Sequence, residues 1–196
     1  MRSGRYFLNS IVIFIRCCLT AWPLQHRLVR KPDCLVYSIG SNGNFDYEDG
    51  LKRIAPNCEI HTFDFGQYSR RNDGIHYHQW GLSNESSSRP LHRLKTFSQT
   101  VRELGHENRR IDLFKMDCEG CEWLTFNDWI RHDIRQINIE VHGLSSVALF
   151  DALDDAGFAL YSKELNPQWP NGIYELSLIK LAPAYWNERS AAEPGP

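Results

Sequence analysis

The chain has 196 residues, of which 42% are hydrophobic and 12% are aromatic, and this is enough for one domain with a sizeable core. Its formal net charge of -2 gives no overall attraction to nucleic acid or to an anionic membrane. The totals exclude a largely disordered chain. They favour a folded domain that binds a small molecule, and we expect no nucleic acid partner.

The first 33 residues differ from the rest, because Arg2 and Arg5 precede an apolar stretch at residues 6–22. A basic start and a short apolar run are typical of a signal peptide, whereas a membrane-spanning helix needs about 20 apolar residues and Arg16 interrupts this run. An amphipathic helix that covers the sheet explains the pattern equally well. Two interpretations of this segment therefore stay open: it is a signal peptide or membrane anchor, or it is a covering helix of a cytoplasmic protein. Membrane contact is expected only through residues 6–22.

Between residues 34 and 182, apolar runs alternate with segments of helical periodicity. The predicted strands are Leu35–Ile39, Glu59–Asp64, Gly74–Trp80, Ile111–Met116, Gln136–Val141, Phe158–Ser162 and Tyr174–Leu181. The first five strands alternate with helices, which predicts a parallel sheet, and the last two should pair as an antiparallel hairpin. The predicted fold is therefore α/β: a three-layer, Rossmann-like sheet of seven strands, mostly parallel, with a C-terminal antiparallel hairpin.

Three residues are placed to cap the predicted helices, namely Asp46, Thr96 and Ser145. Residues 84–89 form a polar loop, and the proline-rich tail at 183–196 is expected to be disordered. Among six scattered cysteines, only Cys118 and Cys121 form a CxxC pair, which supplies at most two of the four ligands of a structural zinc site. We expect a buried or idle thiol pair and no metal site.

A glycine-rich turn, Gly40-Ser41-Asn42-Gly43, follows the first predicted strand. Glycines can take positive φ and let a ligand approach the backbone. The third glycine of the dinucleotide fingerprint is missing, which argues against a nicotinamide oxidoreductase, and no Gly-Lys-Ser or Gly-Lys-Thr of a P-loop follows. An adenosine cofactor without phosphates, such as S-adenosylmethionine, fits this turn better.

Ligands of open parallel sheets bind at the carboxyl ends of the strands. Residues in this position are Asp64 with Phe65, Gly81 with Leu82, Asp117 to Glu119, and Glu140 to His142. Asp64 lies 24 residues beyond Gly40, close to the spacing of about 20 at which an acid meets ribose hydroxyls. The alternative for Asp64 is that it caps a turn before Gly66.

The segment Lys115-Met116-Asp117-Cys118-Glu119-Gly120-Cys121-Glu122 contains an Asp-x-Glu-Gly-x-Glu signature. Together with the glycine turn, Asp64 and the final hairpin, it resembles the class I S-adenosylmethionine-dependent methyltransferases, and more narrowly the FkbM-type and methyltransferase-like group, over roughly residues 34–181. The resemblance implies a cofactor site in which the turn holds the methionine portion, Asp64 the ribose and Gly81-Leu82 the adenine. The cofactor-binding residues are then Gly40, Ser41, Asn42, Gly43, Asp64, Phe65, Gly81, Leu82 and Asp117.

Methyl transfer to a hydroxyl or an amine needs alignment of the reactants and removal of a proton. The predicted catalytic residues are Asp117, Glu119 and His142, with Glu140 as a further candidate base. Glu119 as a helix cap and His142 as a structural residue are the alternatives. We treat His61, His76 and His78 as packing or substrate-rim residues, and Trp169 as a lid over the acceptor.

The sequence thus predicts O-methylation of a small-molecule or glycan-like acceptor by a methyltransferase. A second hypothesis is a catalytically silent Rossmann-like module that binds a protein partner. An exposed apolar patch and negligible cofactor binding would favour that module, whereas turnover would exclude it.

Overall fold

The computed structural model describes residues 28, 30–69, 73–85, 87–89, 92–143, 147–166 and 172–183. The predicted N-terminal signal or covering helix, the predicted cap Ser145, the predicted lid Trp169 and the tail from residue 184 lie outside these residues. Within them, no helix is both long and apolar enough to cross a membrane.

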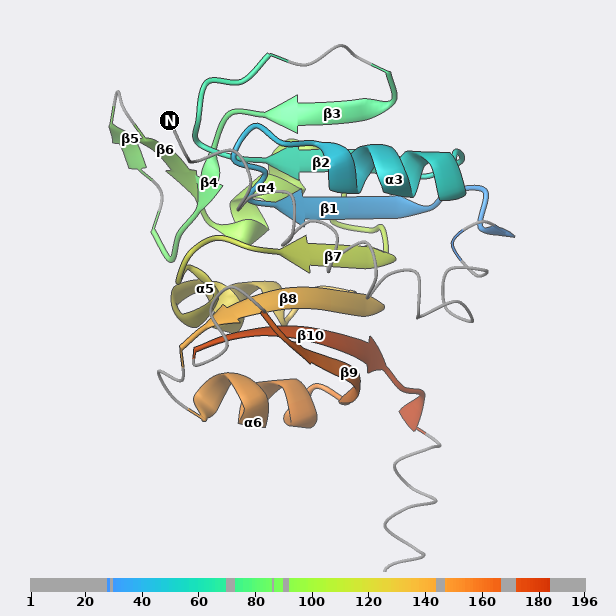
Figure 1. Cartoon of the computed structure of the whole chain (residues 1–196), viewed down its shortest axis with the longest axis vertical. Coiled ribbons are helices and arrows are strands. Elements are labelled where there is room, and N and C mark those ends of the chain that lie inside the picture. The colour runs from blue at the N-terminus through green and yellow to red at the C-terminus, as the bar shows by residue number, and fades with distance from the viewer. Residues whose placement is uncertain are drawn as a thin grey trace, which may run out of the picture.

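A seven-stranded sheet forms the centre of the domain (Figure 1). Its order is β3-β2-β1-β7-β8-β10-β9, with bounds Ile75–His78, Glu59–Phe63, Leu35–Ile39, Leu113–Met116, Gln136–His142, Ile173–Lys180 and Phe158–Leu165. The first five strands in this order are parallel, and β10 pairs antiparallel with both β8 and β9. This confirms the predicted seven-stranded, mostly parallel sheet with its C-terminal hairpin.

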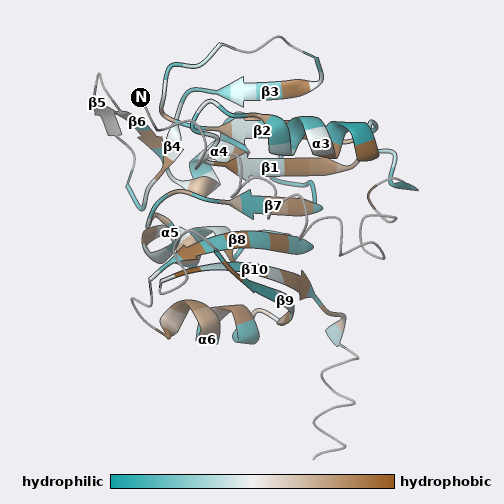
Figure 2. Ribbon diagram, viewed as in Figure 1, coloured by the Kyte–Doolittle hydropathy of each residue, from teal (hydrophilic) through white to brown (hydrophobic). Residues whose placement is uncertain are grey.

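Helices cover both faces of the sheet, as the alternation within β1 requires. Tyr37 belongs to a core with α4 (Phe97–Glu103), α5 (Glu122–Trp129) and α6 (Ala148–Asp155). Val36 points the other way, into a smaller core with α3 (Asp46–Ile54). Figure 2 shows the hydrophobic colouring of β1, whereas β3 begins hydrophobic and becomes hydrophilic toward its arrowhead. The layers are therefore helix, sheet, helix.

Some element boundaries differ from the prediction. Asp46 does not cap α3: the cap position is Phe45, and the backbone N–H of Asp46 donates to Asn44 Oδ1 at 2.9 Å. Thr96 does cap α4, since its side chain accepts from the Gln99 N–H at 3.1 Å. The third strand, β3, is shorter than the predicted strand Gly74–Trp80, because its pairing with β2 stops at His78.

A second, three-stranded sheet was not predicted. It has the order β4-β6-β5, with bounds Gly81–Leu82, His92–Lys95 and Ser87–Arg89, so part of the expected polar loop at 84–89 is a strand. Figure 1 places it beside the arrowheads of the parallel strands. It therefore extends the edge of the sheet at which ligands of this fold class bind.

The described residues contain two disulfides, and one of them corrects the prediction that Cys118 and Cys121 are a thiol pair. Cys34 pairs with Cys58, which joins the amino ends of β1 and β2, and Cys118 pairs with Cys121 directly after β7. The sequence could not reveal the first pair, since the pairing follows from two neighbouring strand starts in the fold. Disulfides are typical of proteins that fold in an oxidising compartment.

Candidate functional site

The carboxyl ends of β1 and β7 meet at Gly40 and Asp117. Gly40 has φ +78°, and a Cβ at this position would lie 1.6 Å from the carbonyl oxygen of Asp117. The Asp117 N–H in turn donates to the Ile39 carbonyl at 3.0 Å. Only glycine fits such close contact. The first glycine of the turn is therefore required because the backbone after β7 packs against it.

Asp64 holds the glycine turn in shape. Its Oδ2 accepts the N–H groups of Ser41 at 3.0 Å and Asn42 at 2.8 Å, and its Oδ1 accepts that of Gly66 at 2.8 Å. The alternative of a turn cap before Gly66 is therefore also realised. A carboxylate can accept about four hydrogen bonds, so these three leave one acceptor position, which a ribose hydroxyl would have to use. The ribose contact stays a prediction.

Tyr68 is a residue of this turn that sequence reasoning missed. A Cβ on Gly43, which has φ +75°, would lie 2.6 Å from the Tyr68 ring, and one on Gly66 would lie 2.4 Å from it. The Tyr68 hydroxyl donates to Asn42 Oδ1 at 3.1 Å. The sequence had suggested that Gly43 makes room for a ligand. In the structure, its missing side chain makes room for the Tyr68 ring.

Phe65 and Leu82, two of the predicted cofactor-binding residues, differ in exposure. The Phe65 side chain follows β2 and is 50% exposed, whereas Leu82 is buried in the core. Phe65 also lies close to Gly81, where a Cβ would approach its ring to 3.2 Å. An exposed aromatic ring next to Asp64 offers a surface on which a base can stack.

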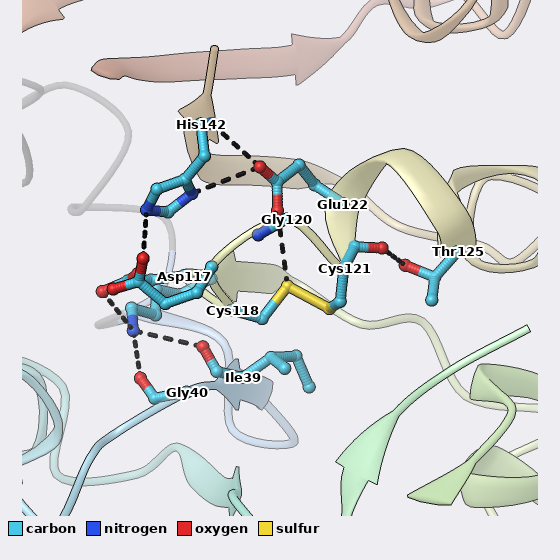
Figure 3. Close-up of a disulfide and its surroundings, with 11 residues drawn as sticks. Ile39, Gly40, Asp117, Cys118, Gly120, Cys121, Glu122, Thr125 and His142 are labelled. Carbon is cyan, nitrogen blue, oxygen red and sulfur yellow. Dashed lines mark hydrogen bonds and ion pairs between the residues drawn. A yellow bond between two sulfur atoms is a disulfide. The ribbon is translucent and has the colours of Figure 1, made fainter. Parts of the chain in front are cut away.

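The signature segment is organised around Glu122, which is fully buried at the start of α5 (Figure 3). Its Oε1 accepts the His142 backbone N–H at 2.8 Å and lies 3.2 Å from His142 Nδ1, while its Oε2 accepts the Gly120 N–H at 2.9 Å. The disulfide sulfur of Cys118 lies 3.6 Å from Oε2. Glu122 therefore joins the end of β8 to the turn that follows β7.

His142 is surrounded by carboxylates. Its Nε2 lies 3.1 Å from both Glu119 Oε2 and Glu140 Oε1. Burial by itself lowers the pKa of His142, but the hydrogen bonds to Glu122 and Glu140 and the charge of Glu119 outweigh burial and raise the pKa to about 10. The imidazole is then charged at neutral pH, which weakens its candidacy as a base.

Glu119 has an unusual backbone, with φ +56°, and its side chain is 84% exposed. It is not the cap of α5, because the cap position is Cys121. The turn aims the Glu119 carboxylate back at His142 and leaves it in contact with solvent.

Asp117 lies at the same rim with a partly exposed side chain. Burial raises the pKa of Asp117, although the Lys115 ammonium, 3.7 Å from Oδ2, acts in the opposite direction. Lys115 Nζ also donates to the carbonyl oxygens of Ile39 and Gly40, so it is fixed beneath the glycine turn. A carboxylate with a raised pKa is better matched to proton transfer near neutral pH.

Glu175 is a further acidic residue that sequence reasoning missed. It is directly opposite Glu140 in the antiparallel pairing of β10 with β8, and it is 1% exposed. Burial and the neighbouring Glu140 carboxylate raise the pKa of Glu175. The pKa of Glu140, in contrast, is lowered: burial raises it, but the hydrogen bonds with His142 and Glu175 act more strongly. The pair therefore carries one negative charge.

Ligand atoms of Asp117, Glu140 and His142 lie within 4.8 Å of one another, a spacing that suits a metal ion. In the metal-free protein the surrounding carboxylates favour the charged imidazole, and we describe this group as an ion-pair network. Two cavities of about 630 and 370 Å³ lie at the opposite edge of the sheet. Arg110 and Arg135 line both of them, Lys180 lines the larger one and Asp112 the smaller one. The predicted site residues line neither.

A comparison of sequences identifies the relatives of the chain. A family described as "Methyltransferase domain" matches residues 21–180. "Probable methyltransferase-like protein 24" of Homo sapiens is 25% identical over 64% of this chain, and its Rattus norvegicus counterpart is 24% identical over the same share. The chain spans 37% of the length of each of these relatives.

Solved structures share the fold. A protein from Plasmodium falciparum, described as a ribosomal RNA methyltransferase, matches with a TM-score of 0.52 and 12% identity over 84% of this chain and 96% of that one. Fibrillarin, a pre-rRNA processing protein of Methanococcus jannaschii, matches with a TM-score of 0.50 and 10% identity over 76% of this chain and 67% of that one. These likenesses confirm the Rossmann-like architecture predicted from the sequence.

Proposed function

The chain belongs to the methyltransferase domain family, among the class I S-adenosylmethionine-dependent methyltransferases, and from this premise we propose that it methylates an oxygen atom of a small-molecule or glycan-like acceptor. The cofactor of the family is S-adenosylmethionine, whose sulfonium supplies an electrophilic methyl group. The narrower FkbM-type resemblance stays a prediction. The observation that carries the proposal is Asp117, a partly exposed carboxylate of raised pKa that is fixed against the glycine turn.

We assign the cofactor to the rim formed by the turn, Asp64 and Phe65. Asp64 retains one acceptor position for a ribose hydroxyl, and Phe65 presents an exposed ring beside it. The Lys115 ammonium donates hydrogen bonds to the carbonyl oxygens of Ile39 and Gly40, where the turn begins. These groups suit a ligand that has hydroxyls and an aromatic base but no phosphates.

Asp117 is the group to which we assign proton removal. With the cofactor bound, the acceptor oxygen would bond to the methyl carbon as the bond from that carbon to sulfur breaks, S-adenosylhomocysteine would be left, and the hydroxyl proton of the acceptor would pass to the Asp117 carboxylate. The charged His142 acts as a positioning residue that holds Glu119 and Glu140 around the acceptor space. This differs from the sequence-based prediction that gave His142 a catalytic role, and it follows from the three carboxylates around the ring.

Tyr68 favours the second candidate, the silent binding module, because its ring covers Gly43 and Gly66. A calorimetric titration with S-adenosylmethionine separates the two. If the chain is a methyltransferase, we expect saturable binding of the cofactor. Phe65→Ala should lower the affinity by about tenfold, because it removes the stacking surface. Leu124, on α5, is 59% exposed, and Leu124→Ala is the matched control that should leave binding unchanged. The absence of binding by a folded preparation would contradict the proposal.

The acceptor class needs its own experiment. Methyl transfer from labelled cofactor is measured with pooled small hydroxylated molecules, with glycans and with structured RNA. Incorporation into the first two, and its loss in Asp117→Asn with cofactor binding retained, is the expected result. RNA belongs in the test because the two structural neighbours above are described with ribosomal RNA, and methylation of RNA alone would contradict the proposed acceptor.

A further inference from the structure

A histidine cluster lies on the α4 side of β2, and only its His78 reaches the rim, where its carbonyl accepts the Asp64 N–H. His61 on β2 stacks on His76 and His78 of β3, with ring centroids 4.8 and 5.1 Å apart, and His106, which follows α4, meets it edge-on at 5.0 Å. The parallel register of β2 and β3 brings His61 and His76 side by side. The cluster therefore joins two neighbouring strands to the segment after α4. The sequence-based prediction treated His61, His76 and His78 as packing or substrate-rim residues, and the structure adds the Glu59 carboxylate to them.

Three ligand atoms converge within this cluster. Glu59 Oε1 lies 3.0 Å from His61 Nε2 and 3.9 Å from His106 Nε2, and all three residues offer ligand atoms within 4.8 Å of one another. We propose that Glu59, His61 and His106 form a Zn²⁺ site, distinct from the cofactor rim. Two imidazoles and one carboxylate are a ligand set that zinc uses when a fourth position holds water.

The second ring nitrogen of each histidine has a partner that orients it. Tyr37 Oη lies 2.8 Å from His106 Nδ1, and His78 Nε2 lies 2.8 Å from His61 Nδ1. Metal-binding histidines generally have such a hydrogen bond, because it fixes the ring and leaves the other nitrogen as the ligand. Tyr37, His61 and His106 are all buried, so these orientations are set by packing as well.

Arg109 is the group that an ion must partly displace. Its Nη1 lies 2.7 Å from Glu59 Oε2 and 3.2 Å from His106 Nε2. The guanidinium can keep its hydrogen bond to Oε2, because the two histidines approach the other oxygen, Oε1, but it has to leave the His106 lone pair. Its side chain is one-third exposed, so it has room to move. The site therefore binds metal in competition with Arg109.

A metal here would connect segments that are far apart in the chain. Glu59 and His61 belong to β2, and His106 comes between α4 and β7. Glu59 is five residues from Asp64, or about 16 Å along the strand, so an ion at this place does not touch the cofactor residues. An ion that binds only the folded state raises the stability of that state.

The test uses the full chain with any histidine tag removed and with metal stripped by a chelator. Calorimetry with Zn²⁺ should show about one equivalent bound, and thermal unfolding should shift upward. Co²⁺ should give visible d–d bands without a thiolate charge-transfer band, because the ligands are nitrogen and oxygen. The absence of binding, or a thiolate band that points to cysteine ligands instead, would overturn the proposal.

Variants locate the site. Glu59→Gln and His61→Gln should weaken Zn²⁺ binding by about tenfold or more, and Tyr37→Phe by about tenfold through the loss of the orienting hydroxyl. His132, which contacts Ser98 at 2.9 Å, is the control, and His132→Gln should bind zinc as the wild type does. Should His61→Gln fail to fold, Tyr37→Phe still decides, because it removes a single hydroxyl. Equal affinity in wild type, Glu59→Gln and Tyr37→Phe would overturn the assignment.

Discussion

His142 and the cluster around His61 differ in charge state, although both combine imidazole and carboxylate groups. His142 lies among Glu119, Glu122 and Glu140, which raise its pKa to about 10. For His61, burial dominates and lowers the pKa to about 4, because its one carboxylate, Glu59, also pairs with Arg109. The number of free negative charges around the ring, and not the residue type, decides whether a buried histidine is a cation or a neutral ligand.

Removal of Glu122 should have the largest effect on this contrast. Glu122→Ala leaves the charged, partly buried His142 without its main partner, and breaking an ion pair of a buried carboxylate costs about 3–5 kcal/mol of unfolding free energy. Denaturant unfolding at pH 7 measures this loss. Glu119→Ala is the matched control, since its carboxylate is 84% exposed, and it should change stability by about 0.5 kcal/mol or less. Equal losses in the two variants would show that burial of the carboxylate does not matter.

The charge on His142 should also appear in the pH dependence of stability. Because the pKa of His142 rises from 6.5 to about 10 on folding, its stabilising contribution is complete below pH 6.5 and is lost as the pH rises through 10. Wild type should therefore exceed His142→Gln by about 2 kcal/mol at pH 6, and the difference should shrink toward pH 10. Unfolding curves of both proteins from pH 6 to 10 test this. A difference that stays constant would mean that His142 is neutral in the folded protein.

The neutral cluster should be less sensitive to the loss of one hydrogen bond. In the metal-free protein, Tyr37→Phe removes the hydroxyl that lies 2.8 Å from His106 Nδ1, and the expected cost is about 1 kcal/mol. Chemical unfolding in the presence of a chelator measures this cost. A loss as large as that of Glu122→Ala would mean that the histidine cluster carries a buried charge.

The sequence predicted the main sheet well because its strands are short apolar runs between helix and turn signals. It predicted the rim for the same reason, since Gly40, Asp64 and Asp117 directly follow such strands. It missed contacts between residues that are distant in the chain. Glu175 reaches Glu140 only through the antiparallel pairing of β10, and the Cys34–Cys58 disulfide only through the adjacency of β1 and β2.

Local pattern predicted β3 but made it too long, and it missed the small second sheet, for a different reason. Polar side chains fill β3 after Ile75 because one of its faces carries the histidine cluster. The strand Ser87–Arg89 has no apolar run at all, and only its pairing with β6 defines it. His106 could not be assigned to the cluster, because it lies after α4 with no strand signal around it.

A crystal structure of the chain with S-adenosylhomocysteine would show whether the carboxyl edge of the sheet binds the cofactor. We predict that the ribose hydroxyls lie within hydrogen-bond distance of Asp64, that the adenine contacts Phe65 and that the sulfur faces Asp117. A ligand in the cavity of about 630 Å³ at the opposite edge, or an empty rim at saturating ligand concentration, would contradict the account.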